Sequence, residues 1–351
     1  NKDLKPLKPF SLGVVSNATT SIIVPALVAT AARYSFSLTV HEAPYGQAVQ
    51  VALGEVEAFK DVVMDAILIA IDYKGLPIQS NTPPFGKDAD AVNESLDYLN
   101  MIRTQLKQKY GAPCIMQTCV HEPESFFGNF DVQVNNTSRQ FINIFNSALV
   151  NEVAGTEDFL LDVAAIAETV GLANWHDPVM YHMAKLPFAQ KLVPFYAEQV
   201  CRIITAMSGK ARRALILDLD DTLWGGVIGD DGLSGIELGQ GNALGEAYLA
   251  VQNTVLKLRQ RGIVLAVCSK NDDTTARIPF REHPDMLLNE SHIAVFRANW
   301  EDKVPNIQFI AETLNLGLES IVFLDDNPVE RDRVRYELPE VAVPELPEDP
   351  A

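Results

Sequence analysis

Acidic residues crowd the end of an apolar run in the second half of the sequence. The stretch LILDLDDTLWGG places Asp218, Asp220 and Asp221 directly after the apolar residues 215–217. Carboxylates this close repel one another and lose hydration, so a neutralising cation is expected beside them. If the cation also binds a phosphate ester, Asp218 is placed to attack the phosphorus atom. Asp220 lies two residues further on, hence on the same face of a strand, and is placed to move the proton.

Three further polar groups follow apolar runs of this half or begin a helix. Ser269, Lys270 and Asn271 follow one run, Lys303 begins a segment of helical period, and an acidic pair follows another run. Each group alone has an ordinary explanation, since Asp and Ser often cap helices and a lysine near a helix start is commonly a surface charge. Because the carboxyl ends of parallel strands meet at one edge of a sheet, the groups together indicate a single site.

These groups predict a magnesium site for phosphoryl transfer, because oxygen ligands suit Mg²⁺ and its charge makes crowded carboxylates tolerable. The expected metal ligands are the carboxylates of Asp218, Asp220, Asp325 and Asp326. The residues expected to hold the phosphoryl group and the substrate are Thr222, Ser269, Lys270, Asn271 and Lys303.

Both halves of the chain alternate short apolar runs with segments of helical period, which is typical of α/β proteins whose parallel sheet has helices on both faces. The apolar runs lie at residues 12–16, 66–72, 114–120, 159–162, 214–219, 263–268, 321–324 and 341–343. A helical segment at 194–208 ends at Gly209, a residue type that closes helices. We therefore expect one α/β domain at residues 1–209 and a second at 210–351.

Composition narrows the class of protein. The 28 Lys and Arg residues against 46 Asp and Glu residues give a formal net charge of −18, which disfavours nucleic-acid binding. The longest apolar stretch, residues 21–32, is too short to span a membrane, and residues 1–10 lack the apolar core of a secretory signal. A cytoplasmic location is expected. The cysteine spacing indicates free thiols rather than a zinc site or disulfides.

The polar groups resemble, in this order, motifs one to four of the haloacid dehalogenase (HAD) superfamily. The matching residues are Asp218, Asp220, Thr222, Ser269, Lys303, Asp325 and Asp326. The strings DLDDTLWGGVIGDDG, AVCSKND, ANWEDK and FLDDNPVERDRVRYELPEV further resemble the FkbH-like branch over residues 213–350. That branch more often reads DLDNTLW, so Asp221 is a departure. The interval between Thr222 and the next helical segment leaves no room for a large cap domain.

The resemblance implies a glyceryltransferase/phosphatase of polyketide biosynthesis. Such an enzyme takes 1,3-bisphosphoglycerate, removes phosphate and loads a D-glyceryl unit onto the phosphopantetheine arm of an acyl carrier protein. Acyl transfer through the enzyme needs a nucleophile, and Cys268, beside Ser269, is the first candidate. The alternatives are a packing role for Cys268, an acyl group on Cys114 or Cys119, and direct transfer to the carrier thiol.

The first half faintly resembles an SGNH hydrolase domain, with Ser16 at the position of the family's serine. GDS and DxxH motifs are absent, and Asp177 and His182 stand at a longer spacing. Asn135 and Asn136 match the family's asparagine block, or form a turn. A helix cap is the alternative for Ser16. We expect this domain to be non-hydrolytic and to act as a lid or to dock the carrier.

Two other functions stay open for the whole chain. A plain small-molecule phosphatase would release phosphate without loading any carrier. A catalytically silent docking module would neither release phosphate nor load a carrier, although it could have the same α/β fold as the enzymes. The presence of Asp220 and Lys303 argues against silence.

Overall fold

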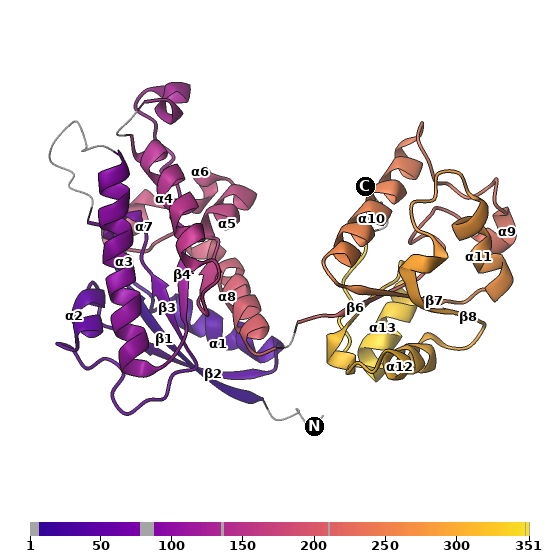
Figure 1. Cartoon of the computed structure of the whole chain (residues 1–351), viewed down its shortest axis with the longest axis horizontal. Coiled ribbons are helices and arrows are strands. Elements are labelled where there is room, and N and C mark those ends of the chain that lie inside the picture. The colour runs from indigo at the N-terminus through magenta and orange to yellow at the C-terminus, as the bar shows by residue number, and fades with distance from the viewer. Residues whose placement is uncertain (1–6, 78–87, 135–136, 210, 348, 351) are drawn as a thin grey trace. The chain divides into compact units, whose positions relative to one another are not determined.

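The structure of the chain is a computed structural model, and it describes residues 7–77, 88–134, 137–209, 211–347 and 349–350. The chain divides into two compact units, Asn1–Ser208 and Gly209–Ala351, one residue away from the division expected at Gly209 (Figure 1). Each unit is a parallel sheet with helices on both faces, so the two-domain α/β prediction is confirmed. Within the described residues, no helix has the length and apolar character that crossing a membrane requires.

The sheet of the first unit has the strand order β2-β1-β3-β4-β5, with every pair parallel. Its strands are β1 (Lys8–Ser16), β2 (Phe36–Glu42), β3 (Ala66–Ala70), β4 (Cys114–Gln117) and β5 (Phe159–Leu161). Its α-helices are α1 (Ile23–Arg33), α2 (Ala48–Leu53), α3 (Asp88–Tyr110), α4 (Ser138–Val153), α5 (Val163–Val170), α6 (Leu172–Trp175), α7 (Pro178–Ala184) and α8 (Val193–Met207). Helices α2, α3 and α4 pack on one face, and α1, α5 and α8 on the other.

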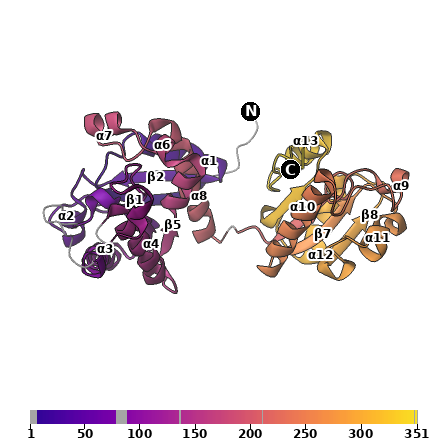
Figure 2. The ribbon, with the colours of Figure 1, turned by 90° about the horizontal axis from the view of Figure 1, so that it is seen from above.

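The sheet of the second unit has the order β8-β7-β6-β9 and is again parallel throughout. Figure 2 shows its strands β7 and β8 side by side. Its strands are β6 (Ala214–Leu217), β7 (Val264–Ser269), β8 (Ile293–Ala298) and β9 (Ile321–Leu324). Its α-helices are α9 (Ile228–Asp231), α10 (Ala243–Gln260), α11 (Asp273–Glu282), α12 (Lys303–Leu314) and α13 (Pro328–Glu337). Helices α10 and α11 cover one face of the sheet, while α12 and α13 cover the other.

Alternation along β6 shows why its run of apolar residues forms a central strand. Leu215 and Leu217 pack with the α10 side, whereas Ala214 and Ile216 pack with the α12 side. All four are buried, as expected for a parallel strand covered on both faces. The strand ends at the carboxyl edge of the sheet, and the acidic residues follow it immediately.

The sequence patterns missed one edge strand in each sheet. Strand β2 alternates buried and exposed residues, and β8 is mostly half-buried, so neither reads as a continuous apolar run. The expected strand at residues 341–343 is wrong, because this segment contributes only an isolated bridge between Val322 and Ala342. No large insertion interrupts residues 223–242, where α9 is the one α-helix before α10.

Candidate active site at the carboxyl edge of the second sheet

The strand order of the second unit reverses at β6, because β7 and β8 lie on one side of it and β9 on the other. Such a reversal opens a crevice beyond the carboxyl ends of the two strands that flank it. Asp218 follows β6, and Asp325 follows β9. The Asp218 amide donates to the Leu324 carbonyl at 2.9 Å, which holds the two strand ends together.

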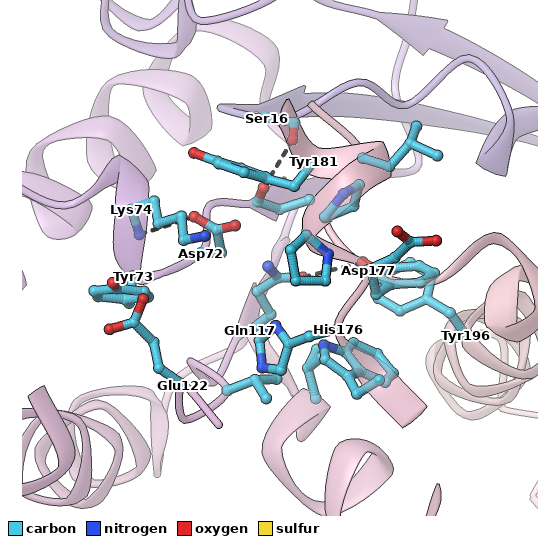
Figure 3. A pocket seen from close by; sticks show the side chains of 18 of the residues that line it. Ser16, Asp72, Tyr73, Lys74, Gln117, Glu122, His176, Asp177, Tyr181 and Tyr196 are labelled. Carbon is cyan, nitrogen blue, oxygen red and sulfur yellow. Dashed lines mark hydrogen bonds between the residues drawn. The ribbon is translucent and has the colours of Figure 1, made fainter. Parts of the chain in front are cut away.

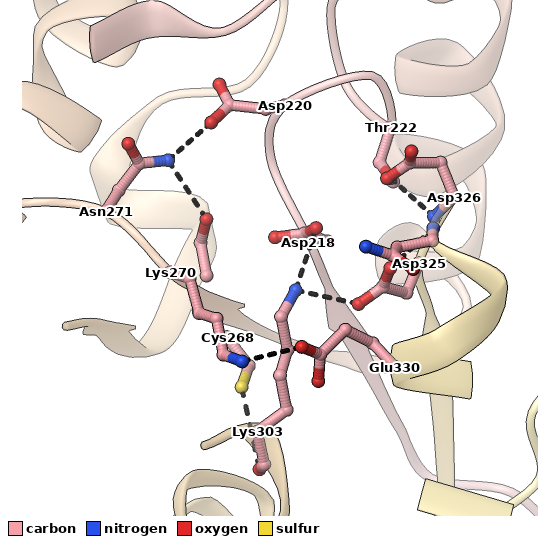
Figure 4. Close-up of polar contacts among 12 residues, drawn as sticks. Asp218, Asp220, Thr222, Cys268, Lys270, Asn271, Lys303, Asp325, Asp326 and Glu330 are labelled. Carbon is pink, nitrogen blue, oxygen red and sulfur yellow. Dashed lines mark hydrogen bonds and ion pairs between the residues drawn. The ribbon is translucent and has the colours of Figure 1, made fainter. Parts of the chain in front are cut away.

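Lys303 is the charged centre of this edge. It is the first residue of α12 and only 3% exposed, and its Nζ lies 2.7 Å from Asp218 Oδ2 and 2.7 Å from Asp325 Oδ2 (Figure 4). Burial by itself lowers the pKa of the ammonium group, but the two carboxylates outweigh this effect and raise it. Lys303 is therefore a permanent cation that neutralises one of the surrounding charges.

Three carboxylates lie together at this edge. Asp218, Asp325 and Asp326 each offer an oxygen, and these oxygens lie within 4.8 Å of one another. Burial, and then the charge of Asp218, raises the pKa of Asp325, and the same causes raise that of Asp326 to about 6. One ammonium cannot balance three carboxylates. Moreover, Asp218 Oδ1 is buried without a hydrogen-bond partner among the described residues. This donor set fits a hard divalent cation.

Asp220 does not join this group, so the geometry does not support the expected carboxylate ligand at that position. Its Oδ2 accepts a hydrogen bond from Asn271 Nδ2 at 2.6 Å, and its Oδ1 accepts from the Trp224 indole at 3.0 Å and the Ile228 amide at 2.9 Å. Asp218 and Asp220 were expected on the same face of a strand because they are two residues apart. That expectation is wrong, because β6 ends at Leu217, before both residues. Burial raises the pKa of Asp220, against the effect of these hydrogen bonds.

Ser269 and Asn271 lie at the end of β7, facing Asp220. Both are 3% exposed, and Asn271 Nδ2 also donates to Ser269 Oγ at 3.2 Å. Thr222 lies on the other side of Asp218, where its hydroxyl accepts a hydrogen bond from the Asp326 amide at 3.2 Å. Thr222 thus fixes the loop that carries the acidic pair.

Lys270 is held by partners that the sequence patterns missed. Its Nζ lies 2.6 Å from Glu330 Oε1 and 3.6 Å from Asp302 Oδ1, and the hydrogen bond to Glu330 raises its pKa. Glu330 lies in the first turn of α13, a position that could have been read from the string FLDDNPVE. Arg331, also missed, is buried and donates through Nη1 to the Asp325 carbonyl at 2.9 Å.

Cys268 faces away from this edge. It is fully buried in the core beneath α12 and α13, with its Sγ 3.9 Å from the Lys303 carbonyl. Burial raises the pKa of its thiol to about 12, so the nucleophilic thiolate is scarce at neutral pH. These features favour the packing role that sequence reasoning left open. Cys114 and Cys119, the other thiols considered, are buried as well.

Ser16 in the first unit bonds to backbone groups, and it caps no helix, because α1 begins at Ile23 with Ile22 as its N-cap residue. The Ser16 hydroxyl donates to the Ala70 carbonyl at 2.9 Å and accepts from the Ala18 amide at 2.9 Å. Asp177 caps α7 by accepting from the Met180 amide at 3.0 Å. Asn135 and Asn136 lie outside the described residues.

Comparison with known proteins places the chain in a family. The family model "FkbH, N-terminal domain" matches residues 11–205. The crystal structure of the N-terminal part of BF1531 from Bacteroides fragilis, which contains a phosphatase domain complexed with Mg, is 31% identical. It superposes with a TM-score of 0.89 over 99% of this chain and 92% of that one.

Two other solved structures match weakly. A HAD family enzyme from Bacteroides thetaiotaomicron is 11% identical over 39% of this chain and 95% of its own, with a TM-score of 0.28. The salicylyl-acyltransferase SsfX3 from a tetracycline biosynthetic pathway is 16% identical over 58% of this chain and 56% of its own, with a TM-score of 0.32. None of the curated proteins matches. Because the family model covers more than half of the sequence and BF1531 aligns over nearly all of it, the chain belongs to the FkbH family.

Proposed function

We propose that the second unit is a Mg²⁺-dependent phosphatase of the HAD type. The observation that carries the proposal is the surplus of negative charge, since the carboxylates of Asp218, Asp325 and Asp326 lie together and the buried Lys303 is paired with the first two. The 31% identical BF1531 structure, with its phosphatase domain complexed with Mg, supports this assignment. Asp218, Asp325 and Asp326 would hold the ion, which would neutralise carboxylate and phosphoryl charge during the reaction.

Asp218 is the proposed nucleophile. Lys303 fixes its Oδ2 at 2.7 Å, while Oδ1 has no hydrogen-bond partner among the described residues. A bond forms between the Asp218 carboxylate and phosphorus as the bond from phosphorus to the leaving oxygen breaks. Lys303 stays protonated throughout and balances the charge on the phosphoryl oxygens. Ser269 and Asn271, joined to each other and through Asn271 to Asp220, would serve as further hydrogen-bonding groups for the substrate.

Asp220 is the proposed acid and base. Its raised pKa favours a bound proton, which it gives to the leaving oxygen in the first step. In the second step, the Asp220 carboxylate takes a proton from water as the water oxygen attacks phosphorus. The bond between phosphorus and Asp218 then breaks, which releases phosphate and restores both aspartates. The hydrogen bonds from Asn271 and Trp224 hold the Asp220 carboxylate in one orientation.

Membership of the FkbH family supports a more specific proposal for the substrate. The chain would take 1,3-bisphosphoglycerate and an acyl carrier protein, as enzymes of polyketide biosynthesis do. The carrier thiol would attack the acyl phosphate carbon, forming the thioester and releasing one phosphate. The aspartates would remove the second phosphate from the 3-position. All four cysteines of the chain are buried, which favours direct transfer to the carrier thiol over an acyl group on Cys268.

The test is mass spectrometry of the carrier. The full chain is incubated with Mg²⁺, 1,3-bisphosphoglycerate and a phosphopantetheinylated acyl carrier protein, and the mass gain of the carrier is measured together with phosphate release. A gain of one glyceryl unit supports the transferase. Phosphate release with an unchanged carrier supports the plain phosphatase instead, and neither signal would support the silent docking module.

A matched pair of variants controls this experiment. Asp218→Asn removes the nucleophile and should abolish removal of the 3-phosphate. Asp221→Asn makes the same chemical change three residues away, where Asp221 is exposed and accepts from the Gly226 amide at 2.8 Å. Asn tolerates the positive φ of 50° at this position, so Asp221→Asn should retain activity.

We further propose that the first unit serves the second as a lid or as the dock of the carrier protein, with a non-hydrolytic SGNH-like fold. The hydrogen bonds of Ser16 support the absence of hydrolysis, because its hydroxyl is committed to the backbone. The test is deletion of residues 1–208 from the chain. If the shortened chain still produces the same mass shift on the carrier, both roles are contradicted.

A further inference from the structure

The first unit contains a pocket of its own beyond the carboxyl ends of its strands. Strand order reverses at β1, which lies between β2 and β3, and the pocket is lined by Ser16, the last residue of β1, and by Asp72, which follows β3 (Figure 3). Its volume is about 330 Å³, which is within the range of small-molecule sites in proteins. The proposed phosphatase chemistry uses no residue of this pocket.

Three aromatic side chains give the pocket an apolar wall. The ring centroid of Trp175 lies 4.6 Å from that of Phe188, which lies 5.0 Å from that of Tyr196. All three side chains are buried and pack into the core of the unit, which holds the rings in place. A fixed wall of this kind suits a flat apolar body.

Charged side chains of the lining are already engaged within the protein. Asp72 accepts a hydrogen bond from the Lys74 amide at 2.9 Å, and Lys74 Nζ lies 3.7 Å from the centroid of the Tyr181 ring. Glu122 forms a hydrogen bond with the Tyr73 hydroxyl. A charged ligand would lose its own hydration on entering and would gain little from groups that already have partners. The lining therefore favours a neutral ligand.

Gln117 offers a hydrogen-bond donor to the pocket. It is the last residue of β4, only 8% exposed, and its Oε1 accepts from the Tyr196 hydroxyl at 3.0 Å. Burial raises the pKa of Tyr196, so this hydroxyl keeps its proton and remains the donor. The other amide atom, Nε2, has no hydrogen-bond partner among the described residues. Because an N–H group without a partner is costly in a nearly buried place, a ligand carbonyl is favoured there.

His176 offers an acceptor to the same pocket (Figure 3). Its Nε2 lies 2.7 Å from the His121 carbonyl oxygen, which can only accept, so Nε2 carries the hydrogen. In the neutral ring Nδ1 is then an acceptor, and within the part of the chain that the structure describes it has no hydrogen-bond partner. A donor at Gln117 and an acceptor at His176 match the carbonyl oxygen and the N–H group of a secondary amide.

The pocket is not arranged to cleave such an amide. The Ser16 hydroxyl donates to the Ala70 carbonyl at 2.9 Å, and the hydrogen on His176 Nε2 is directed to the His121 carbonyl. The serine and the histidine therefore bond to backbone and not to each other, so they do not form the pair that activates a nucleophile. The features that remain are those of a binding site.

We propose that this pocket binds, without cleaving it, a neutral compound that carries a secondary amide on a flat apolar body. The body packs against Trp175 and Phe188. The amide carbonyl accepts a hydrogen bond from Gln117 Nε2, and the amide N–H donates to His176 Nδ1. This binding is independent of the phosphate chemistry proposed for the second unit.

Four probes with a benzyl body test this proposal by isothermal titration calorimetry of the full chain. They are N-benzylacetamide, benzyl acetate, benzylamine and phenylacetate. The amide should bind about fivefold more tightly than the ester, because the ester lacks the N–H group that donates to His176. The amine and the carboxylate, which are both charged, should bind at least about tenfold more weakly than the amide. An ester as tight as the amide, a charged probe tighter than the amide, or no heat from the amide at millimolar concentration would each overturn the proposal.

Variants separate the two hydrogen bonds. Gln117→Met removes the donor and should weaken the amide and the ester alike, about fivefold, because both probes have the carbonyl. His176→Phe removes the acceptor and should weaken the amide to the level of the ester while leaving the ester unchanged. Gln108→Met makes the same change as Gln117→Met at an exposed position of α3 outside the pocket, and should alter neither affinity.

A double variant controls for disturbed packing. Gln117→Met leaves the Tyr196 hydroxyl without its acceptor, whereas Gln117→Met with Tyr196→Phe removes both partners and preserves the fold better. The double variant should show the same fivefold loss. An amide affinity that survives in both would refute the assignment. Asp218→Asn should bind all probes as the unsubstituted chain does, so a failed phosphatase assay leaves this test intact.

Discussion

Replacing Lys303 by methionine should destabilise the second unit strongly. The substitution keeps most of the side-chain volume but removes the cation that lies 2.7 Å from each of two carboxylates. The Asp325 side chain is 0% exposed and that of Asp218 is 11% exposed, so water cannot replace the lost ammonium. Removing one partner of a buried ion pair typically costs about 3–5 kcal/mol. We expect a loss of that size from a total stability of about 5–15 kcal/mol.

Lys270→Met provides the matched control in the same site. The Lys270 side chain is 35% exposed, and its partners Glu330 and Asp302 are 14% and 45% exposed, so solvent reaches the ammonium group and screens the lost contacts. Partly exposed ion pairs are worth about 0–1 kcal/mol, which sets the expected loss for this variant.

The assay is native-state hydrogen exchange followed by mass spectrometry, at neutral pH in the presence of a chelator. Peptides covering β6 and β9 report the free energy of opening of the second unit independently of the first. Lys303→Met should lower this free energy by several times as much as Lys270→Met, and Mg²⁺ should restore part of it by replacing the missing positive charge. Equal small losses in the two variants would refute the reasoning that Lys303 neutralises buried carboxylates.

Three further predictions follow from the same site. Mg²⁺ at about one hundred times its dissociation constant should stabilise the second unit by about 2.7 kcal/mol, and Asp326→Asn should weaken that effect; an unchanged melting curve would contradict it. Because burial raises the pKa of Asp326 to about 6 in the folded protein, above its usual 3.8, the folded state holds that proton more tightly. Stability without metal should therefore fall as pH rises through about 6, and stabilisation by Mg²⁺ should grow over the same range; denaturation curves at several pH values check both trends. Asp220→Asn should lower phosphate release about 10²–10⁴-fold without loss of Mg²⁺ binding, and a parallel loss of binding would show that Asp220 is a metal ligand after all.

The edge that carries the site could be predicted from sequence because it depends on strand ends. The acidic and polar groups at residues 218–222, 269–271 and 325–326 each follow an apolar run, and parallel strands bring such positions together whatever the intervening helices contain. The convergence of Asp218 and Asp325 is of this kind, whereas Lys303 was identified by its place at the start of a helical segment. The buried runs of the central strands are equally local signals, which is why the α/β class is confirmed while two half-exposed edge strands escaped notice.

Side-chain orientation was beyond these patterns. The direction of Asp220 depends on donors from Trp224, Ile228 and Asn271, which meet only once the loop after β6 has folded. The pairing of Lys270 joins it to Glu330, sixty residues away along the chain. The face on which Cys268 lies follows from strand alternation, but the depth of its burial depends on how α12 and α13 pack. These features arise from tertiary packing and leave no periodic trace in the sequence.

The most direct test of the central claim is phosphate release from 3-phosphoglycerate by protein stripped of metal with a chelator, as Mg²⁺ is titrated back. If a divalent ion completes the cluster of Asp218, Asp325 and Asp326, release should be absent at the start and should rise to saturation with added Mg²⁺. Undiminished release from the stripped protein would contradict the proposed role of these carboxylates.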